Sequence, residues 1–162
     1  MCIRDRYCMA FGLKIIAYDP YKIINDVHIN QVSDLDQLLT TSDIISINVS
    51  GIKENTNLIS EKQFKLMKKN AILINTSRGN TVNIEALINN IEKMKIAGAG
   101  IDVIQNEHEF PKKYSKQLLN KVIKLQKQNK LFITPHIAGS THEARVKRLK
   151  YVLKYFLKEL KK

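Results

Sequence analysis

The chain alternates short apolar segments with longer segments whose apolar residues recur at helical spacing. Apolar segments of strand length lie at residues 13–19, 43–50, 71–76, 97–104 and 131–134. Such an alternation is typical of a parallel sheet whose strands are joined by crossover helices. The pattern therefore predicts a doubly wound α/β sheet with helices on both of its faces.

Capping residues indicate where the helices between these strands begin. Ser60 and Gln63 have the spacing of a capping box, which opens a helix to about residue 69. Ser140 and Glu143 repeat that spacing and open a long amphipathic helix to about residue 160. Further helices are predicted from Ser33 or Asp34 to about residue 41, from Asn83 through IEALINNIEKM, and over residues 116–126.

Length and composition restrict the class of protein. A chain of 162 residues is long enough for one domain with a proper core but short for two. No apolar run reaches the roughly 18 to 20 residues that a membrane-spanning helix needs, so such a helix is excluded. Cys2 and Cys8 lie close together and form no disulfide framework or metal site, which favours a cytoplasmic location.

The net charge of +12 is typical of proteins that bind nucleic acids. Most of this charge, however, is lysine scattered through a sequence rich in isoleucine and asparagine. The densest basic segment, residues 145–162, alternates with apolar residues at helical spacing. A solvated helix face explains that segment better than a nucleic-acid-binding surface, and the positive field favours small anionic ligands.

Polar residues gather where the predicted strands end. Ligands of doubly wound sheets bind beyond the carboxyl ends of the strands. Any one of these residues alone would be explained by a turn, but five polar strand ends together predict a binding crevice. The residues are Asp19, Asn48 and Ser50, the segment Thr76 to Gly79, the segment Asp102 to Glu107, and the segment Thr134 to His136.

Asp19 is a candidate ligand of an adenosine ribose. An acidic residue at the end of an early strand hydrogen-bonds the ribose hydroxyls and repels a 2′-phosphate, which favours NAD over NADP. The alternative is that Asp19 and Pro20 only end the strand. The companion motif G-x-G-x-x-G, expected about 20 residues upstream, is absent from the 18 residues that precede Asp19. We therefore expect a fold truncated at its N-terminus.

Arg78, Glu107 and His136 are candidates for acid–base chemistry on an anionic substrate. A guanidinium binds a carboxylate through two parallel hydrogen bonds. A histidine at a strand end can exchange a proton with a substrate hydroxyl near neutral pH, and a carboxylate can fix its tautomer. The alternatives are a surface arginine in a turn and a structural histidine, and His108 competes for the role beside Glu107.

Four segments resemble, in order and spacing, the signature segments of the D-isomer-specific 2-hydroxyacid dehydrogenases. They are AFGLKIIAYDP, INTSRGNTVNIEAL, AGAGIDVIQNEHEF and ITPHIAGSTHEA, and the resemblance extends over about residues 9–160. It implies a Rossmann-like domain that binds NAD in an oxidoreductase acting on a D-2-hydroxy or 2-keto acid. HIAGST resembles the phosphoglycerate dehydrogenase branch most, with glyoxylate and hydroxypyruvate reductases as alternatives.

The resemblance also implies roles for individual residues. The catalytic residues would be Arg78 for the substrate carboxylate and carbonyl, Glu107 as the acidic partner and His136 as the proton donor or acceptor. Asp19 would bind the adenosine ribose, and Asp102 the carboxamide of the nicotinamide. The cofactor-binding set implied in this way is Asp19, Thr76, Ser77, Arg78, Asp102, His136 and Gly139.

The sequence also departs from the family it resembles. His108 replaces a proline that usually follows the catalytic glutamate, and the segment between Glu107 and His136 is several residues longer than usual. Residues 1–6 match nothing in the family and are expected to be a leader or an artefact. Residues 7–162 would then form a partial NAD-binding domain with a C-terminal helix, without most of the substrate domain. A homodimeric enzyme is the expectation, and an NAD(H)-sensing corepressor-like protein is the alternative.

Overall fold

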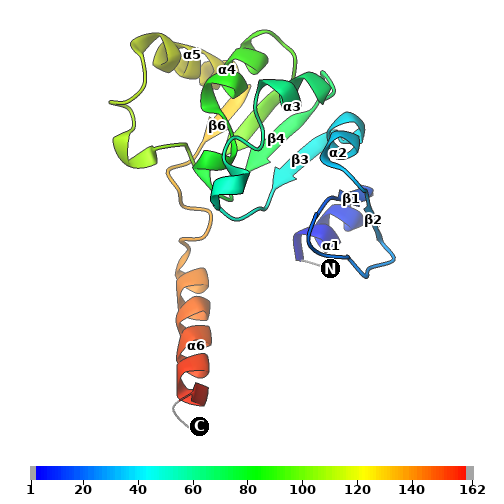
Figure 1. Ribbon diagram of the computed structural model, residues 1–162. Coiled ribbons are helices and arrows are strands. Elements are labelled where there is room, and N and C mark those ends of the chain that lie inside the picture. The colour runs from blue at the N-terminus through cyan, green and yellow to red at the C-terminus, as the bar shows by residue number, and fades with distance from the viewer. Residues whose placement is uncertain (1–2, 160–162) are drawn as a thin grey trace.

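The computed structural model describes residues 3–159 and arranges their strands in two parallel sheets (Figure 1). The smaller sheet pairs β1 with β2, and the larger has the order β3-β4-β5-β6. Both sheets are wholly parallel, which confirms the predicted α/β class. The strands are β1 (Ile15–Ala17), β2 (Ile29–Gln31), β3 (Ile44–Ile47), β4 (Ile72–Asn75), β5 (Gly98–Ile101) and β6 (Leu131–Ile133).

The sequence pattern located every strand except β2. Its three residues, Ile-Asn-Gln, include two polar side chains and show no apolar run from which a strand could be predicted. Parallel pairing with β1 nevertheless places Ile29 opposite Ile15. Hydrogen bonds to the neighbouring strand thus hold residues 29–31 in an extended conformation, although their side chains do not have the pattern of a strand.

The helices for which a capping residue was predicted begin close to it. Asp34 and Asn83 each accept a hydrogen bond from a backbone N–H in the first helical turn, and so does Ser115, for which no cap was predicted. The last helix is capped by Thr141, whose hydroxyl accepts from the Ala144 N–H at 3.1 Å, and not by Ser140 as predicted. The helices are α1 (Ile3–Ala10), α2 (Leu35–Thr41), α3 (Glu61–Leu66), α4 (Ile84–Glu92), α5 (Lys116–Lys127) and α6 (His142–Glu159).

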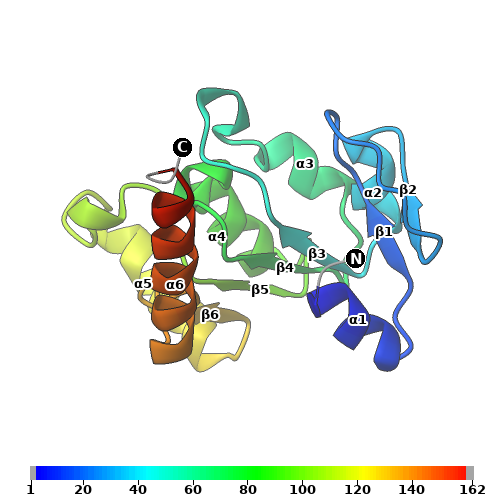
Figure 2. The same cartoon turned by 90° about the horizontal axis from the view of Figure 1, so that it is seen from below.

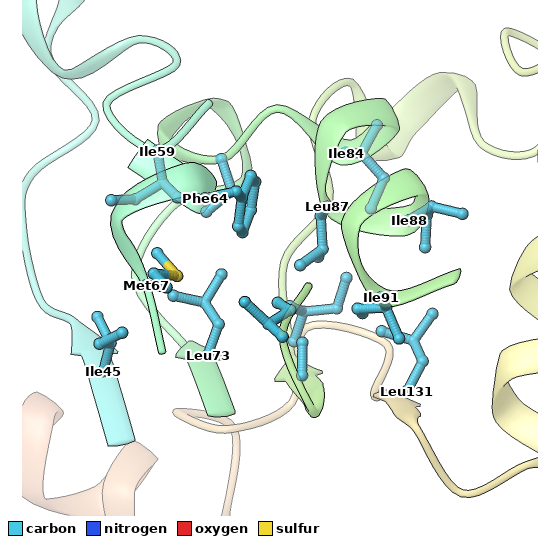
Figure 3. Close-up of a cluster of buried hydrophobic side chains, with 14 of the residues drawn as sticks. Ile45, Ile59, Phe64, Met67, Leu73, Ile84, Leu87, Ile88, Ile91 and Leu131 are labelled. Carbon is cyan, nitrogen blue, oxygen red and sulfur yellow. The ribbon is translucent and has the colours of Figure 1, made fainter. Parts of the chain in front are cut away.

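The core lies between the larger sheet and a layer formed by α2, α3, α4 and α5. Neighbouring helices of that layer contact one another in this order. Leu87 and Ile91 point from α4 towards the strands that carry Leu73 and Leu131 (Figure 3). All four of these side chains are 1% exposed or less. Their complete removal from water is a main source of the domain's stability.

The opposite face of the larger sheet is uncovered in the part of the chain that the structure describes. The apolar segment at residues 43–50 predicted that helices cover both faces of the sheet. This prediction is wrong for residues 3–159. Ile44 is 51% exposed and Phe132 is 62% exposed on that face. In Figure 2 the short α1 lies on that side, opposite α3 and α4. One eight-residue helix is too small to cover four strands.

The break between the two sheets has a place in the usual strand order. Doubly wound sheets have the order 3-2-1-4-5-6, and the glycine-rich turn follows the first strand. With β2 and β1 in the third and second places and β3 in the fourth, the first place lies between β1 and β3. None of the residues from 3 to 159 forms a strand there. The strand that the order lacks is therefore the one that would carry the glycine-rich turn.

Helix α6 extends away from the rest of the chain (Figure 1). Its apolar side chains remain in contact with solvent, including Leu149, Leu153 and Phe156, which are 57–61% exposed. Among the helices of residues 3–159, none combines the length and the apolar character needed to cross a membrane.

Candidate functional site

The carboxyl ends of the four strands of the larger sheet lie side by side at one edge of that sheet. Ile47, Asn75, Ile101 and Ile133 are successive partners across it. The segments that follow these residues therefore leave the sheet side by side. They contain most of the candidates predicted from sequence, so the expected convergence of polar strand ends is found for β3 to β6.

His136 and Glu107 form a hydrogen-bonded pair at this edge. The Nδ1 atom of His136 lies 2.8 Å from Oε1 of Glu107, and both side chains are partly exposed. His136 has a left-handed backbone with φ of 54°, which is uncommon for a residue other than glycine. Glu107 opens the 3-10 helix η3 (Glu107–Glu109). His108, the competing histidine, is exposed on the same turn, and Glu107 binds His136 instead.

The carboxylate of Asp102 holds the loop that presents His136. Its Oδ1 accepts hydrogen bonds from the Thr134 hydroxyl at 2.5 Å and the Ile137 N–H at 2.9 Å. Its Oδ2 accepts from the Ala138 N–H at 2.9 Å, and its backbone carbonyl accepts from the His136 N–H at 2.9 Å. Asp102 is 4% exposed, so these bonds keep a buried charge satisfied.

The same contacts determine the ionisation of Asp102. Burial alone would raise its pKa, but the hydrogen bonds from Thr134, Ala138 and Ile137 outweigh burial and lower the pKa below the ordinary value. Hydrogen bonds to the charged form of a carboxyl favour that form. The loop around His136 is therefore tied to an ionised carboxylate at neutral pH.

Arg78 lies on a loop organised by a buried asparagine. Asn75 is 1% exposed, and its Oδ1 accepts from the Ser77 N–H at 3.0 Å and the Ser77 hydroxyl at 2.9 Å. Its Nδ2 donates to the Arg78 carbonyl at 3.1 Å, which also accepts from the Thr81 hydroxyl at 2.7 Å. Sequence reasoning missed Asn75 and Thr81; the signal was an amide at the end of an otherwise apolar strand.

Gly79 brings the Arg78 loop against the segment that leads to Glu107. A Cβ atom at Gly79 would lie 2.2 Å from the carbonyl carbon and oxygen of Ile104 and 2.6 Å from the Gln105 nitrogen. Side-chain atoms do not approach backbone so closely, so only glycine fits here. The turn after β4 and the turn after β5 are thus packed backbone to backbone.

The guanidinium of Arg78 is exposed to solvent. Its Nη1 donates a hydrogen bond to the Ser77 carbonyl at 2.7 Å. The remaining guanidinium donors are therefore available to an anion. Arg78 thus has the chemistry expected of a carboxylate-binding residue.

Asp19 lies at the end of β1 in the smaller sheet. Its Oδ1 accepts from the Tyr21 N–H at 2.9 Å and the Lys22 N–H at 3.2 Å, so the carboxylate also ends the strand through a local turn. Asn48 and Ser50 follow β3: the Asn48 Oδ1 accepts from Arg4 Nη1 at 2.6 Å. Asp19 therefore belongs to the smaller sheet, whereas the candidates after β3 to β6 belong to the loops of the larger sheet.

The remaining candidates for cofactor binding lie on the loops after β4 and β6. Thr76 and Gly139 are exposed, and a Cβ at Gly139 would meet no atom within 4 Å. Ser77 is half-buried and bound to Asn75. Open space at Gly139 and a solvent-facing Thr76 leave room for a ligand beside the strand ends.

The donors and acceptors present suit the two ends of a dinucleotide. A carboxylate at the end of β1 fits ribose hydroxyls, and open loops after β4 and β6 fit a nicotinamide. A diphosphate needs a glycine-rich turn, and the sequence contains no G-x-G-x-x-G motif. Within residues 3–159 no group of His, Cys, Asp or Glu residues could hold a metal ion.

Known proteins resemble this chain in sequence and in structure. A D-3-phosphoglycerate dehydrogenase of Saccharomyces cerevisiae is 38% identical over 140 residues, which cover 83% of this chain and 29% of that protein. A glyoxylate reductase of Thermococcus litoralis is 41% identical over 139 residues, covering 84% of this chain and 38% of the relative. The NAD-complexed D-isomer specific 2-hydroxyacid dehydrogenase of Lactobacillus delbrueckii ssp. bulgaricus superimposes with a TM-score of 0.82 and 31% identity.

The superposition covers 96% of this chain and 48% of the solved one. The chain thus spans less than half the length of the relatives it matches. The sequence profile of the NAD-binding domain of D-isomer specific 2-hydroxyacid dehydrogenases matches residues 4–138, which is most of the chain. The chain belongs to the D-isomer specific 2-hydroxyacid dehydrogenase family, whose NAD-binding domain it carries.

Proposed function

We propose that the protein containing this chain is an NAD-dependent oxidoreductase that interconverts a D-2-hydroxy acid and the corresponding 2-keto acid. The observation that carries the proposal is the His136–Glu107 pair, with 2.8 Å between Nδ1 and Oε1, at the strand ends where this fold binds ligands. NAD, when bound, supplies the hydride chemistry. The chain's own residues orient the substrate and move its proton.

His136 acts as the acid–base residue. Because Nδ1 faces Glu107, the other ring nitrogen, Nε2, is the one left for the substrate. In the oxidative direction Nε2 accepts the hydroxyl proton, and in the reductive direction it returns the proton to the carbonyl oxygen. Glu107 fixes the tautomer and stabilises the imidazolium that forms. A positioned base of this kind contributes about a hundredfold to ten-thousandfold in rate.

Arg78 anchors the substrate through its carboxylate. Its exposed guanidinium provides parallel donors, and a carboxylate accepts them in a bidentate arrangement. The same group polarises the oxygen at C2. The loop around Asn75 and the backbone contact at Gly79 support this role, because they fix the Arg78 backbone next to the segment that carries Glu107.

We assign five further residues to the cofactor: Asp19, Thr76, Ser77, Asp102 and Gly139. Asp19 binds the adenosine ribose, which favours NAD over NADP. The others lie on the nicotinamide side. The Asp102 carboxylate accepts three hydrogen bonds, and a carboxylate can accept about four. One acceptor site is therefore left for a donor such as the carboxamide.

We further propose a phosphoglycerate dehydrogenase-like substrate, a homodimeric assembly and a cytoplasmic location. The HIAGST segment supports the substrate branch, and the net charge of +12 supports an anionic substrate. The exposed apolar side chains on the open sheet face and on α6 support association, since such surfaces usually become buried.

The experiment uses the longest open reading frame that contains these residues. NADH and NADPH oxidation are followed with 3-phosphohydroxypyruvate, hydroxypyruvate, glyoxylate and pyruvate as substrates. We expect turnover with NADH, highest with 3-phosphohydroxypyruvate and far lower with NADPH. Preference for another of these acids would reject the branch alone. NADH binding without turnover of any acid would reject the enzyme and favour an NAD(H)-sensing protein.

A further inference from the structure

Gly51 lies directly against the side chain of Arg78. A Cβ atom at residue 51 would lie 2.8 Å from Cγ of Arg78, 3.3 Å from its Cβ and 3.4 Å from its Cδ. Real Cβ atoms essentially never come within 3.0 Å of a heavy atom outside their own residue and its two chain neighbours. The aliphatic part of the Arg78 side chain thus occupies the space that the Cβ atom of any other residue at position 51 would need.

The backbone of Gly51 does not itself require glycine. Its φ lies outside the left-handed region, so alanine could adopt the same conformation. The residue is also exposed, and alanine there would not disturb the core. The contact with Arg78 is therefore the feature of this position that excludes a side chain.

The loop that contains Gly51 is held from two sides. The Asn55 side chain donates to the Ser50 carbonyl at 2.9 Å, and the Asn80 side chain donates to the Gly51 carbonyl at 3.5 Å. Asn80 belongs to the turn that follows Arg78. Because the loop is tied on both sides of the contact, an added methyl group at residue 51 would displace the arginine side chain before it displaced the loop.

We propose that Gly51 is a positioning residue that sets the guanidinium of Arg78 for the substrate carboxylate. The proposal rests on the proposed function, in which Arg78 is the carboxylate anchor. A bidentate arginine–carboxylate contact depends on the direction of both N–H bonds. The residue at position 51 would therefore tune the affinity for the substrate without touching it.

The expected kinetic effect is confined to the substrate. Misplacement of a positioning group by about 1 Å can cost up to about a hundredfold in rate. For Gly51→Ala we expect KM for the 2-keto acid to rise about tenfold or more. The carboxylate contact holds ground state and transition state alike and acts on KM, whereas polarisation of the oxygen at C2 acts on kcat, so kcat should also fall, by a smaller factor. The Kd for NADH should stay unchanged, and so should Tm.

A double-mutant cycle with Arg78→Ala separates positioning from a general effect of the loop. The reading frame that contains this chain is prepared as Gly51→Ala, as Arg78→Ala and as the double variant. Each is measured for 2-keto acid reduction and for the Kd of oxalate with NADH present. Glu54→Ala, an exposed change on the same loop, is the matched control. Oxalate provides a carboxylate readout that needs no turnover.

We expect Gly51→Ala to weaken oxalate binding about tenfold in the presence of Arg78 and less than about twofold in its absence, because coupled residues are not additive. Equal weakening in both backgrounds, or none with Arg78 present, would overturn the role of Gly51 while leaving the proposed function intact. If oxalate binding depends on Arg78 but no 2-keto acid is turned over, the proposed enzymatic function is rejected. The oxalate measurements would still decide the role of Gly51. A wild type that binds no oxalate would overturn both.

Discussion

The imidazole of His136 and the carboxylate of Glu107 meet at 2.8 Å although 28 residues separate them in the chain. Two turns make the meeting possible. Asn106 and His136 both have left-handed backbones, with φ of 53° and 54°, and each turn follows a strand of the same parallel sheet. Such conformations are uncommon for residues other than glycine. The fold thus brings the two side chains together because the loops that carry them follow neighbouring strands, β5 and β6.

Replacement of Glu107 by glutamine tests this pair. Glutamine keeps the size but removes the charge that stabilises the imidazolium, so kcat/KM for the 2-keto acid should fall about a hundredfold, with the Kd for NADH unchanged. Glu109→Gln is the matched control, because Glu109 is on the same turn and its side chain forms an exposed ion pair with Lys113. Equal losses in both variants would show that the turn, and not the pair, is responsible.

Asp102→Asn should destabilise the protein at neutral pH. An amide cannot accept all three hydrogen bonds that the carboxylate accepts, so a donor of this partly buried network loses its partner, at a cost of about 1–3 kcal/mol. The free energy of unfolding in urea measures this cost. Asp43→Asn, which removes one carboxylate of an exposed ion pair with Lys68, should cause a much smaller change. A loss no larger than that of Asp43→Asn would contradict the anchoring role of Asp102.

The cost of Asp102→Asn should depend on pH. The pKa of Asp102 is lower in the folded state than its ordinary value of about 3.9. A lowered carboxyl pKa adds stability above the unfolded value, and this stability is lost as pH falls through the folded value. The difference between wild type and variant should therefore be constant above about pH 5 and shrink below about pH 4. A difference that grows on acidification would contradict the assignment.

Gly79→Ala should disrupt the contact between the turns after β4 and β5. The added Cβ would meet the Ile104 backbone at 2.2 Å, so the backbone must shift, at a cost of about 1–3 kcal/mol. Gly100→Ala is the matched control, because its Cβ would meet only the end of the Ile74 side chain, at 3.2 Å. Urea unfolding of both variants compares the costs. A larger loss for Gly100→Ala would mean that the packing of these turns is not tight.

The positive charge should not make the protein bind nucleic acid. A gel shift with random duplex DNA at physiological salt should show no complex, because charges scattered over the surface do not track phosphates along a groove. The same assay at low salt provides the positive control for weak electrostatic association. A complex that persists at physiological salt would contradict the view that the lysines only solvate the surface.

Much of the fold could be predicted because its signals are local. Apolar segments identify β1 and β3 to β6, and capping residues such as Asp34 and Asn83 identify helix starts. The segment Ile29–Gln31 could not be recognised, because its partner strand and not its own side chains makes it a strand. The open sheet face could not be predicted either, since apolar composition shows that a face prefers burial but not what covers it.

Candidates for the site could be named from the sequence where a residue type has a specific chemistry at a strand end. Arg78, Glu107 and His136 were proposed in this way, and the structure brings the last two into contact. Asn75 and Gly51 were not, because their effect is on the placement of other groups. The close approach of the Arg78 side chain to Gly51, where an added Cβ would lie 2.8 Å from Cγ, depends on the folded structure and cannot be read from the sequence.

The role of His136 is the central claim and is tested most directly by NADH-dependent reduction of the preferred 2-keto acid. The wild type, His136→Ala and His108→Ala are compared in the reading frame that contains this chain. We expect His136→Ala to lose turnover by about a hundredfold or more while its Kd for NADH stays within twofold, and His108→Ala to retain activity. Turnover by His136→Ala at the wild-type rate would contradict the account.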